Sequence, residues 1–518
     1  MKDLVYHRSL LPAASRFADK PASIDGEFRA TFSEHLERVL RLADALHSEL
    51  GMQSSDRMAV MALNSHQYLE LYHASLLGAA VINPLNLRLA PKELEFILQD
   101  SGTKVCFTDA FFAPLIDRVR QNTALEKVVL IGAGDVPHDH EYEALLSAGR
   151  PIIPAEPEET YASLLMYTGG TTGLPKGVVI DHRAAILDMY KIAARWPFTS
   201  DYVYLHQTPM FHAASFGGVL VIPAVGGTTT YVPLFDPPKV LEVIERERVS
   251  TTVMVPTMVQ MMLDHPEFKP ERFASMTALT YGASPMPTAL LERLLALFPD
   301  LDIYQGYGMT ENCGLLTCLG PEEHRAGGEM LKSAGYPVPG SLISVQDEDG
   351  NMLGAGEVGE VCARAGNYMR EYWNRPDETA AAFEGGWYHT GDAGKLDERG
   401  YLYLVDRVKD MIVTGGENVY SGEVENALSK HPAVAQVAVI GIPSDAWGEA
   451  VHAIIILKPG ADTGEDELKS WAREHIAGYK VPKSIEFRTD PFPLSGAMKV
   501  LKRELRAPFW EGKERLVQ

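Results

Sequence analysis

Several features that mark special classes of protein are scarce or absent in this sequence. Its 518 residues include only four cysteines, which are scattered and lack the paired spacing of zinc ligands or of a disulfide framework. No apolar run reaches the ~18 residues that a membrane-spanning helix needs, and the first ten residues contain no uninterrupted apolar stretch like that of a signal peptide. The sequence therefore predicts a cytoplasmic protein with reduced thiols and no transmembrane segment.

Positively charged residues are also scarce relative to negatively charged ones. There are 47 lysines and arginines against 69 aspartates and glutamates, so the formal net charge is −22. This balance argues against nonspecific binding to nucleic acid or to an anionic membrane, and no nucleic-acid partner is expected. A small polyanionic substrate remains compatible with it, provided that a few positive side chains converge on one site.

The pattern of apolar residues predicts three kinds of structure along the chain. Strand-like runs alternate with amphipathic helices up to about residue 340, which is typical of parallel α/β sheets. One of these helices follows a capping box formed by Thr31 and Glu34. Short alternating strands with glycine turns continue to residue 405, and the rest of the chain mixes helices and strands in a unit of about 110 residues.

We therefore expect an α/β protein with two domains. The N-terminal domain (1–405) contains two α/β sheet subdomains and a small β-rich subdomain. A hinge (406–410) leads to a small, mobile α+β C-terminal domain (411–518), which begins where the composition changes.

A glycine- and threonine-rich loop, YTGGTTGLPKG at residues 167–177, lies between two strand-like runs. Its glycines permit positive φ angles, so successive backbone amides can point at one anion, and Lys176 adds a positive charge. A Walker loop would place the lysine directly before Ser or Thr and lead into a helix. Because Lys176 follows Pro175 and leads into a strand-like run, a Walker ATPase is excluded. The residues predicted to hold phosphate are Thr168, Gly169, Gly170, Thr171, Thr172, Gly173 and Lys176.

Two later segments have the same form. LTYGASP at 279–285 and IYQGYGMTE at 303–311 each consist of a strand-like run that ends in glycine, aromatic and hydroxyl residues. The carboxyl ends of parallel strands meet at one edge of a sheet, where α/β enzymes bind their ligands. We therefore expect both turns to contribute to one ligand site.

Six segments, in the same order, resemble the signature motifs of the adenylate-forming superfamily, which includes acyl-CoA synthetases, peptide-synthetase adenylation domains and beetle luciferases. They are the loop at 167–177, YGMTE at 307–311, HTGD at 389–392, DRVKDMI at 406–412, GGENVYSGEVE at 415–425 and LSGAMKVLKREL at 494–505. The resemblance covers nearly the whole chain. It implies an acid–thiol ligase that uses ATP, Mg²⁺ and coenzyme A.

The resemblance also implies roles for individual residues. Tyr307 would stack on adenine, Thr310 would bind the α-phosphate, and Glu311 would hold Mg²⁺, a hard cation that prefers carboxylate ligands. Asp392 would accept both ribose hydroxyls, as its two oxygens allow, and Arg407 would also contact the ribose. The residues expected to line the adenine and phosphate site are completed by Gly282, Ala283, Ser284 and Gly308.

In the C-terminal domain, the resemblance implies that Lys499 bridges the substrate carboxylate and a phosphate oxygen in the first of two steps. Rotation about Lys409 would then withdraw Lys499 and bring in a tunnel for the thiol. The residues of this tunnel are Gly415, Gly416 and Glu417. Relatives usually carry glycine where this chain has Met498. The implied catalytic set is Lys499, Thr168, Lys176, Glu311 and His212.

The acid is less closely specified. His212 matches a position that borders the carboxylate, and it is grouped with Phe216 and Tyr281 as the acyl pocket; Phe211 and Cys313 are further candidates for its wall. A medium- to long-chain fatty acid is the first expectation, and an aromatic or other organic acid is the second. No carrier segment follows Gln518, which favours coenzyme A as the acceptor.

The sequence leaves several alternatives open. These are a stand-alone adenylation enzyme that loads a carrier-protein thiol, a monooxygenase of the luciferase kind, and a non-catalytic nucleotide-binding protein. The presence of Lys499 argues against the last, because binding alone would not require it. Oligomeric state is open, with a homodimer as one candidate.

Overall fold

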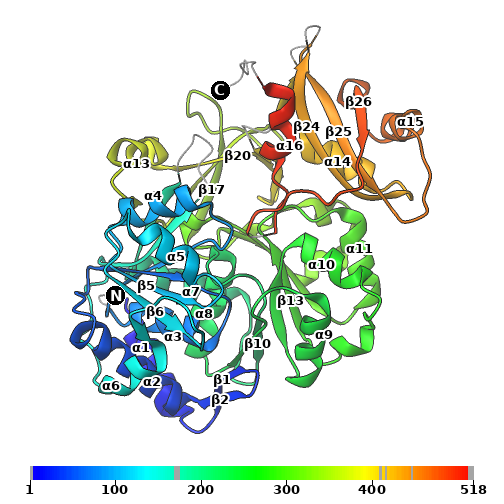
Figure 1. Cartoon of the computed structure of the whole chain (residues 1–518). Helices are drawn as coiled ribbons and strands as arrows, with labels where there is room; N and C mark the ends of the chain where they lie inside the picture. Colours follow the sequence, from blue (N-terminus) through cyan, green and yellow to red (C-terminus); the bar gives the residue numbers. More distant parts are fainter. Residues whose placement is uncertain are drawn as a thin grey trace.

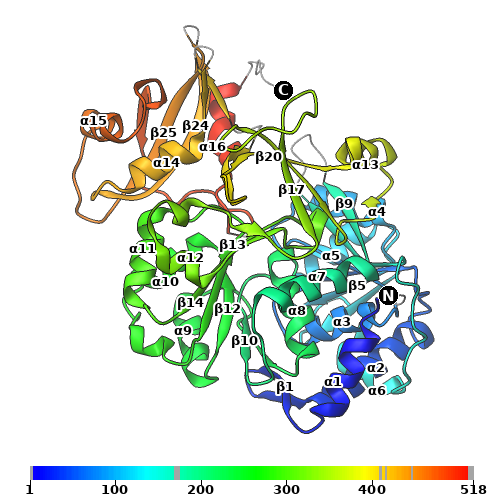
Figure 2. The same ribbon diagram turned by 180° about the vertical axis from the view of Figure 1, so that it is seen from behind.

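The computed structural model describes residues 4–168, 175–407, 411–414, 417–444, 447–496 and 498–511. It has a large N-terminal α/β domain with two mixed sheets and a smaller third sheet, followed by a small α+β C-terminal domain. This arrangement confirms the predicted fold class. Figures 1 and 2 show the C-terminal domain, coloured orange to red, lying across one end of the N-terminal domain.

The first mixed sheet has nine strands in the order β16-β15-β14-β13-β12-β10-β11-β1-β2. Its strands are β1 (Pro21–Asp25), β2 (Phe28–Thr31), β10 (Val203–His206), β11 (Thr228–Tyr231), β12 (Thr251–Met254), β13 (Ala278–Gly282), β14 (Asp302–Tyr307), β15 (Thr317–Leu319) and β16 (Tyr336–Pro337). The central strands from β11 to β14 pair in parallel, as the alternation of strands and helices predicts.

The second mixed sheet has eight strands in the order β19-β9-β8-β4-β3-β5-β6-β7. Its strands are β3 (Arg57–Met61), β4 (Val81–Pro84), β5 (Val105–Asp109), β6 (Lys127–Ile131), β7 (His140–Glu141), β8 (Ala162–Thr168), β9 (Lys176–Asp181) and β19 (Glu371–Tyr372). Strands β8 and β9 form an antiparallel hairpin. The glycine-rich loop therefore connects two strands, as its flanking sequences predicted.

Helices cover both sheets and lie between them (Figure 2). They are α1 (His7–Arg16), α2 (Phe32–Ser48), α3 (His66–Leu76), α4 (Pro91–Ser101), α5 (Ala113–Arg120), α6 (Tyr142–Ala148), α7 (His182–Arg195), α8 (Ala213–Ala224), α9 (Pro237–Arg246), α10 (Pro256–Asp264), α11 (Thr288–Leu297), α12 (Pro321–Ala326) and α13 (Pro376–Ala382). One buried apolar cluster extends from the second sheet through α2 and α3 to α7 and α8. Within the described residues, no helix is both long enough and apolar enough to cross a lipid bilayer.

The capping box predicted at the start of α2 is present. The Thr31 hydroxyl accepts from the Glu34 amide at 3.2 Å, and the Glu34 carboxylate accepts from the Thr31 amide at 2.8 Å. These bonds satisfy amides that the first helical turn leaves without partners, so they fix where the helix begins.

The third sheet corrects one expectation. Its strands are β17 (Ser341–Gln346), β18 (Gly359–Ala365), β20 (Tyr388–Leu396) and β21 (Leu402–Arg407), all antiparallel. Short alternating strands are expected in this part of the chain, but the HTGD segment of β20 does not indicate a strand, because it contains a glycine and short polar residues that are typical of turns. It is nevertheless the longest strand of this sheet, paired with β18 on one side and β21 on the other.

The C-terminal domain is built on a five-stranded sheet. Its elements are β22 (Ile412–Thr414), β23 (Glu417–Val419), α14 (Ser421–Ser429), β24 (Val434–Ser444), β25 (Gly448–Leu457), α15 (Glu465–His475), β26 (Ser484–Phe487) and α16 (Lys502–Trp510). Helices α14 and α15 share an apolar core with the sheet. The segment that precedes α16 returns to the N-terminal domain (Figure 1).

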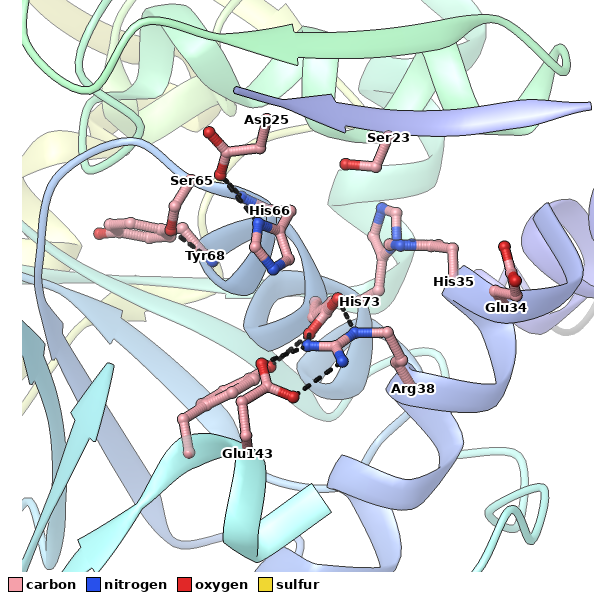
Figure 3. Close-up of polar contacts among 12 residues, drawn as sticks. Ser23, Asp25, Glu34, His35, Arg38, Ser65, His66, Tyr68, His73 and Glu143 are labelled. Carbon is pink, nitrogen blue, oxygen red and sulfur yellow. Dashed lines mark hydrogen bonds and ion pairs between the residues drawn. The ribbon is translucent and has the colours of Figure 1, made fainter. Parts of the chain in front are cut away.

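A buried polar cluster joins β1, α2, α3 and α6 (Figure 3), and these elements lie on the far side of the molecule from the C-terminal domain (Figure 1). The guanidinium of Arg38 donates to both oxygens of Glu70, at 2.7 and 3.2 Å, and to both oxygens of Glu143. Glu70 is 1% exposed and also accepts from the Tyr142 hydroxyl at 2.7 Å. Every oxygen of Glu70 thus has a donor, which is what a buried carboxylate requires.

The replacement Arg38→Leu is expected to lower the free energy of unfolding by about 3–5 kcal/mol, because it leaves the buried charge of Glu70 without its cation. Urea denaturation measures this loss. The control is Arg325→Leu, which removes an ion pair with Asp302 in which both side chains are exposed, and it is expected to cost at most about 1 kcal/mol. Equal losses in the two variants would contradict the structural role given to Arg38.

Candidate active site

A large cavity lies where the C-terminal domain meets the N-terminal domain, and residues of both domains line it. It is at the carboxyl ends of the parallel strands β13 and β14, where the topology of α/β sheets favours ligand binding. The predicted site residues that line it are Thr168, Lys176, His212, Tyr281, Gly282, Ala283, Ser284, Tyr307, Gly308, Thr310, Glu311, Asp392 and Lys499.

The close approach of two backbones shapes the edge of the sheet. Gly282 lies opposite Gly306 in the parallel ladder, and a Cβ atom on Gly282 would be 2.4 Å from the carbonyl oxygen of Gly306. Glycine is required there for that reason. The next residue, Ala283, has a φ of 67°, a left-handed conformation that costs an L-residue about 1–2 kcal/mol. Such strain is typical of backbone that the surrounding structure holds in place at a ligand site.

The HTGD segment forms a bulge in β20. Cys362 of β18 lies opposite His389, but Glu360 lies opposite Ala393, so β20 advances four positions while β18 advances two. The bulge brings Thr390, Gly391 and Asp392 to the cavity wall. Bulges often redirect side chains next to active sites in this way.

A hydrogen bond joins this bulge to the sheet edge. The Tyr307 hydroxyl donates to Oδ2 of Asp392 at 2.7 Å. Burial, together with the charge of Asp392, raises the pKa of Tyr307 well above its usual value, so the phenol stays protonated and remains a donor. The carboxylate of Asp392 is thereby held in one orientation at the cavity.

Glu311 lies in the short 3₁₀ turn Thr310–Asn312 at the end of β14. Its Oε1 atom accepts from the Tyr372 hydroxyl at 3.0 Å, and its backbone carbonyl accepts from the amide of Met369 at 2.6 Å. The carboxylate is therefore positioned by the segment around β19, which is more than fifty residues away in the sequence.

A buried hydrogen-bond network supports the 3₁₀ turn that carries Glu311. The Asn367 side-chain amide donates to the carbonyl of Asn312 at 2.7 Å and to Oδ1 of Asp188 at 2.9 Å, while Lys191 donates to Oδ1 of Asn367 at 2.5 Å. Burial raises the pKa of Asp188 to about 7 and lowers the pKa of Lys191 to about 8. No motif predicted these residues. The one signal was a pair of charges, Asp188 and Lys191, three positions apart on the buried face of a helix.

Lys176 lies at the start of β9, and its ammonium group forms an ion pair with Glu378 of α13. The same group lies 5.2 Å from the centre of the Tyr372 ring, within the range of a cation–π contact. A phosphate that approaches Lys176 must therefore compete with Glu378, a residue that sequence reasoning missed because it lies outside the motifs.

His212 caps helix α8. Its Nδ1 atom accepts from the amide of Ala214 at 3.2 Å, which places the proton of the neutral ring on Nε2. Burial and the positive charge of Lys499 lower its pKa to about 3. At neutral pH the ring is therefore uncharged, with an N–H group that can donate on the cavity side.

Lys499 reaches this cavity on a loop that is docked on the N-terminal domain. Arg88 donates to the carbonyl of Leu494 at 2.5 Å, and Thr257 donates to the carbonyl of Met498 at 2.7 Å. A Cβ atom on Gly496 would be 2.2 Å from Oδ1 of Asn86, so the loop fits closely against this surface. Contacts at both ends and in the middle thus hold the loop in place.

The same loop is closed by its own hydrogen bonds. The Ser495 amide donates to the carbonyl of Lys499 at 2.7 Å, and the Met498 amide donates to the carbonyl of Ser495 at 2.9 Å. Met498 has a φ of 61°, the left-handed region that favours glycine. Its side chain packs against an apolar cluster of the N-terminal domain, so docking offsets this strain.

Some predicted residues are not placed at the cavity. Phe216 packs 5.8 Å from Tyr72, ring centre to ring centre, in the apolar core and does not line the cavity, which corrects its assignment to the acyl pocket. Cys313 is likewise buried outside the lining, whereas Phe211 is part of it. The following residues lie outside the described part of the chain: Gly169, Gly170, Thr171, Thr172, Gly173, Lys409, Gly415 and Gly416. The side chains of Arg407 and Glu417 also lie outside it.

A two-domain protein with a cavity at the edge of a parallel sheet, and with a lysine supplied from the C-terminal domain, belongs to a recognisable class of nucleotide-dependent enzymes. The model of the AMP-binding enzyme family matches residues 11–373, and the model of the AMP-binding enzyme C-terminal domain matches residues 423–499. The chain belongs to the AMP-binding enzyme family of AMP-forming acid–thiol ligases.

Curated relatives match over nearly the full length of the chain. The chain is 36% identical over 496 residues to the fatty acid–[acyl-carrier-protein] ligase ScoC of Streptomyces coeruleorubidus, covering 95% of this chain and 94% of the relative. It is 37% identical over 481 residues to feruloyl-CoA synthase of Amycolatopsis sp, covering 92% and 94%. Among solved structures, a fatty acyl CoA synthetase of Mycobacterium tuberculosis matches with a TM-score of 0.77 and 32% identity, covering 99% of both chains.

The ion pair at Lys176 gives a test of the phosphate site. The replacement Glu378→Gln removes the competing carboxylate, and we expect the KM for ATP to fall about two- to fivefold, with little change in stability, because the pair is partly exposed. The matched control is Glu371→Gln, whose partner Arg370 is at the surface. An unchanged or higher KM in Glu378→Gln would show that Lys176 does not bind the nucleotide.

Proposed function

We propose that this protein is an acyl-CoA synthetase. It activates a carboxylic acid with ATP to form an acyl-adenylate and pyrophosphate, and it then transfers the acyl group to the thiol of coenzyme A, with release of AMP. A medium- to long-chain fatty acid is the proposed acid. The observation that carries this proposal is the docked loop, which places Lys499 of the C-terminal domain in the lining of the same cavity as His212 and the sheet edge.

The first step must bring a carboxylate to the α-phosphorus of ATP, and both groups are anionic. Lys499 would lie between them and offset the charge that develops there, the kind of term that contributes most in many enzymes. The neutral His212 would donate from Nε2 to a carboxylate oxygen and orient it. Neither residue needs to act as a base, because the carboxylate is already ionised at neutral pH.

The nucleotide would occupy the sheet edge. Its base would lie against Ala283 and Tyr307, its ribose hydroxyls would donate to Asp392, and its phosphates would extend toward Lys176 and Thr310. The carboxylate of Glu311 fits Mg²⁺, which prefers oxygen ligands. When bound, Mg²⁺ supplies positive charge that offsets the charge of the departing pyrophosphate.

The second step requires that Lys499 leave the cavity. We propose the domain limits expected from the sequence, 1–405 and 411–518, with a hinge at 406–410 about which the C-terminal domain turns. That motion would bring the loop around Gly416 to the cavity and open a path for the thiol. A thiol with a pKa of about 8.5 ionises readily enough that no dedicated base is needed.

Part of the cavity lining supports an apolar acid. The lining includes a set of hydrophobic and aromatic side chains from α7, α8 and nearby segments. These are Ile192, Trp196, Phe198, Tyr204, Phe211 and Ile222. The indole N–H of Trp196 donates to the Thr280 hydroxyl at 3.0 Å, so that ring has its polar atom satisfied and offers an apolar face.

Two alternatives, one for the acid and one for the acceptor, are each supported by a specific observation. The hydroxyls of Tyr204 and Thr251 at the cavity would suit a hydroxylated aromatic acid, and one relative is a feruloyl-CoA synthase. Another relative is an acyl-carrier-protein ligase, which makes a carrier-protein thiol the alternative acceptor.

We propose a cytoplasmic location because all four cysteines are free thiols in the structure, as expected in a reducing compartment.

The replacement Lys499→Ala is expected to lower acid-dependent ATP–pyrophosphate exchange by about 10²–10³-fold, because it removes the charge that offsets the attack. Exchange is measured across acids from hexanoate to palmitate and with hydroxycinnamates, and acyl-thioester formation is then followed with coenzyme A or a carrier protein. The control is Lys483→Ala, which removes an exposed lysine of the same domain.

Wild-type exchange that is lost in Lys499→Ala and retained in Lys483→Ala would support the proposal and identify the acid. Exchange that survives in Lys499→Ala would contradict the role of this lysine. Thioester formation on the carrier protein alone would replace coenzyme A as the acceptor.

A further inference from the structure

Three potential metal ligands of different types meet beneath the HTGD bulge. They are the thiol of Cys362 and the carboxylate of Glu360, both on β18, and the imidazole of His389 on β20. Their ligand atoms all lie within 4.8 Å of one another. Nothing in the proposed reaction uses Cys362 or His389, so the cluster has no role in the mechanism given above.

The strand pairing explains why the three side chains meet. Cys362 lies directly opposite His389 in the antiparallel ladder, and Glu360 precedes Cys362 by two positions, which places both side chains on one face of β18. The bulge in β20 shifts the register by two residues between Cys362 and Glu360. It leaves the Gly391 amide without a strand partner, and Oε1 of Glu360 accepts from that amide at 2.9 Å.

The distances fit a tetrahedral ion. The Sγ atom of Cys362 is 3.5 Å from Nδ1 of His389, and Nδ1 is 2.8 Å from Oε2 of Glu360. With zinc bonds of about 2.3 Å to sulfur and about 2.0–2.2 Å to nitrogen and oxygen, tetrahedral ligand atoms lie roughly 3.2–3.6 Å apart. The first distance already has this value, and the second needs the carboxylate to move by about half an ångström.

Each ligand is also oriented by a second contact. The Nε2 atom of His389 is 3.3 Å from the carbonyl oxygen of Glu384, to which it donates, so Nδ1 faces the other two side chains. The Gly391 amide holds Oε1 of Glu360 and leaves Oε2 toward the histidine. Outer contacts of this kind fix the ligand atoms of metal sites in advance.

The site is reachable from solvent through the cavity. Glu360 and His389 line the cavity and are 30% and 28% exposed, whereas Cys362 is fully buried behind them. An ion could therefore enter from the cavity and keep one open position for water, as catalytic and exchangeable zinc sites do.

We propose that Glu360, Cys362 and His389 form a binding site for one divalent transition-metal ion of the zinc class. Nitrogen, sulfur and oxygen donors together favour Zn²⁺ over the hard cation Mg²⁺, which binds oxygen. Binding requires the thiolate of Cys362 and an Nδ1 atom of His389 without a proton, so a proton on either atom passes to solvent. The ion then joins β18 to β20 directly beneath the bulge that carries Asp392.

The test uses the full-length protein, stripped of metal with a chelator and titrated with Co²⁺ as a spectroscopic probe. We expect the near-ultraviolet charge-transfer band of a cobalt–thiolate bond, saturating at one ion per chain, and its loss when Zn²⁺ is added. Cys362→Ser should abolish the band, and His389→Ala should weaken binding at least tenfold. Cys106→Ser, which changes another buried strand cysteine, is the control and should bind as the wild type does.

Other outcomes would overturn the proposal. The absence of a thiolate band in the wild type, or equal affinity in the wild type and His389→Ala, would leave Glu360 and His389 as a simple ion pair that supports the bulge. If Cys362→Ser does not fold, the variants Glu360→Gln and His389→Ala test the site instead. Thermal unfolding in the presence and absence of Zn²⁺ is the second measurement. A Tm that rises with Zn²⁺ in the wild type and not in these variants supports the site.

The proposal is independent of the ligase reaction. Lys499→Ala, which leaves the cluster intact, should bind Co²⁺ with the wild-type spectrum even though it is inactive in the exchange assay. A failure of the ligase assay and a failure of metal binding are therefore separate results.

Discussion

The docking of the 494–499 loop onto the N-terminal domain is the contact on which the candidate site depends. In the proposed reaction Lys499 is the cation that lies between the acid and the nucleotide, and the docked loop brings it to the cavity. Hydrogen bonds from Arg88 and Thr257 to the loop backbone supply that cation by placing Lys499 beside His212. Both bonds end on carbonyl oxygens, so they depend on the path of the loop more than on its side chains.

Backbone strain at Met498 partly offsets the contacts that hold the docked loop. Met498 adopts a left-handed backbone, at a cost of about 1–2 kcal/mol. Its packing against the N-terminal domain and its sulfur contact with Arg88, at 3.8 Å, offset that cost only while the loop is docked. Undocking would remove these contacts and, at the same time, relieve the backbone strain at Met498. The two effects partly cancel, which would suit the proposed rotation of the C-terminal domain between the two steps.

The sequence predicted most of the fold because its elements follow local rules. Apolar periodicity identified the strands and helices, and the capping box at Thr31 located the start of α2. The missed strand β20 carries glycine and polar residues, since its bulge faces a ligand site and not a core. The supports of Glu311 were also missed: Tyr372 and Asn367 come from distant segments, and only the three-dimensional structure brings them to Thr310–Asn312. Motifs identify the residues that face a ligand. The residues that position those motif residues leave little signal in the local sequence.

The most direct test of this account is a single-turnover comparison of the two half-reactions in Gly496→Ala. The added Cβ would lie 2.2 Å from Oδ1 of Asn86, so the docked loop fits only if the Asn86 side chain leaves the position in which it accepts from the Arg88 amide, and we expect docking to weaken; Gly478→Ala, in the same domain and with no atom within 4 Å of its Cβ, is the control. The account predicts that adenylate formation falls about tenfold or more in Gly496→Ala, because docking is weakened, while thiolysis of a presynthesised acyl-adenylate continues near the wild-type rate. Equal loss of both half-reactions, or no loss of the first, would contradict it.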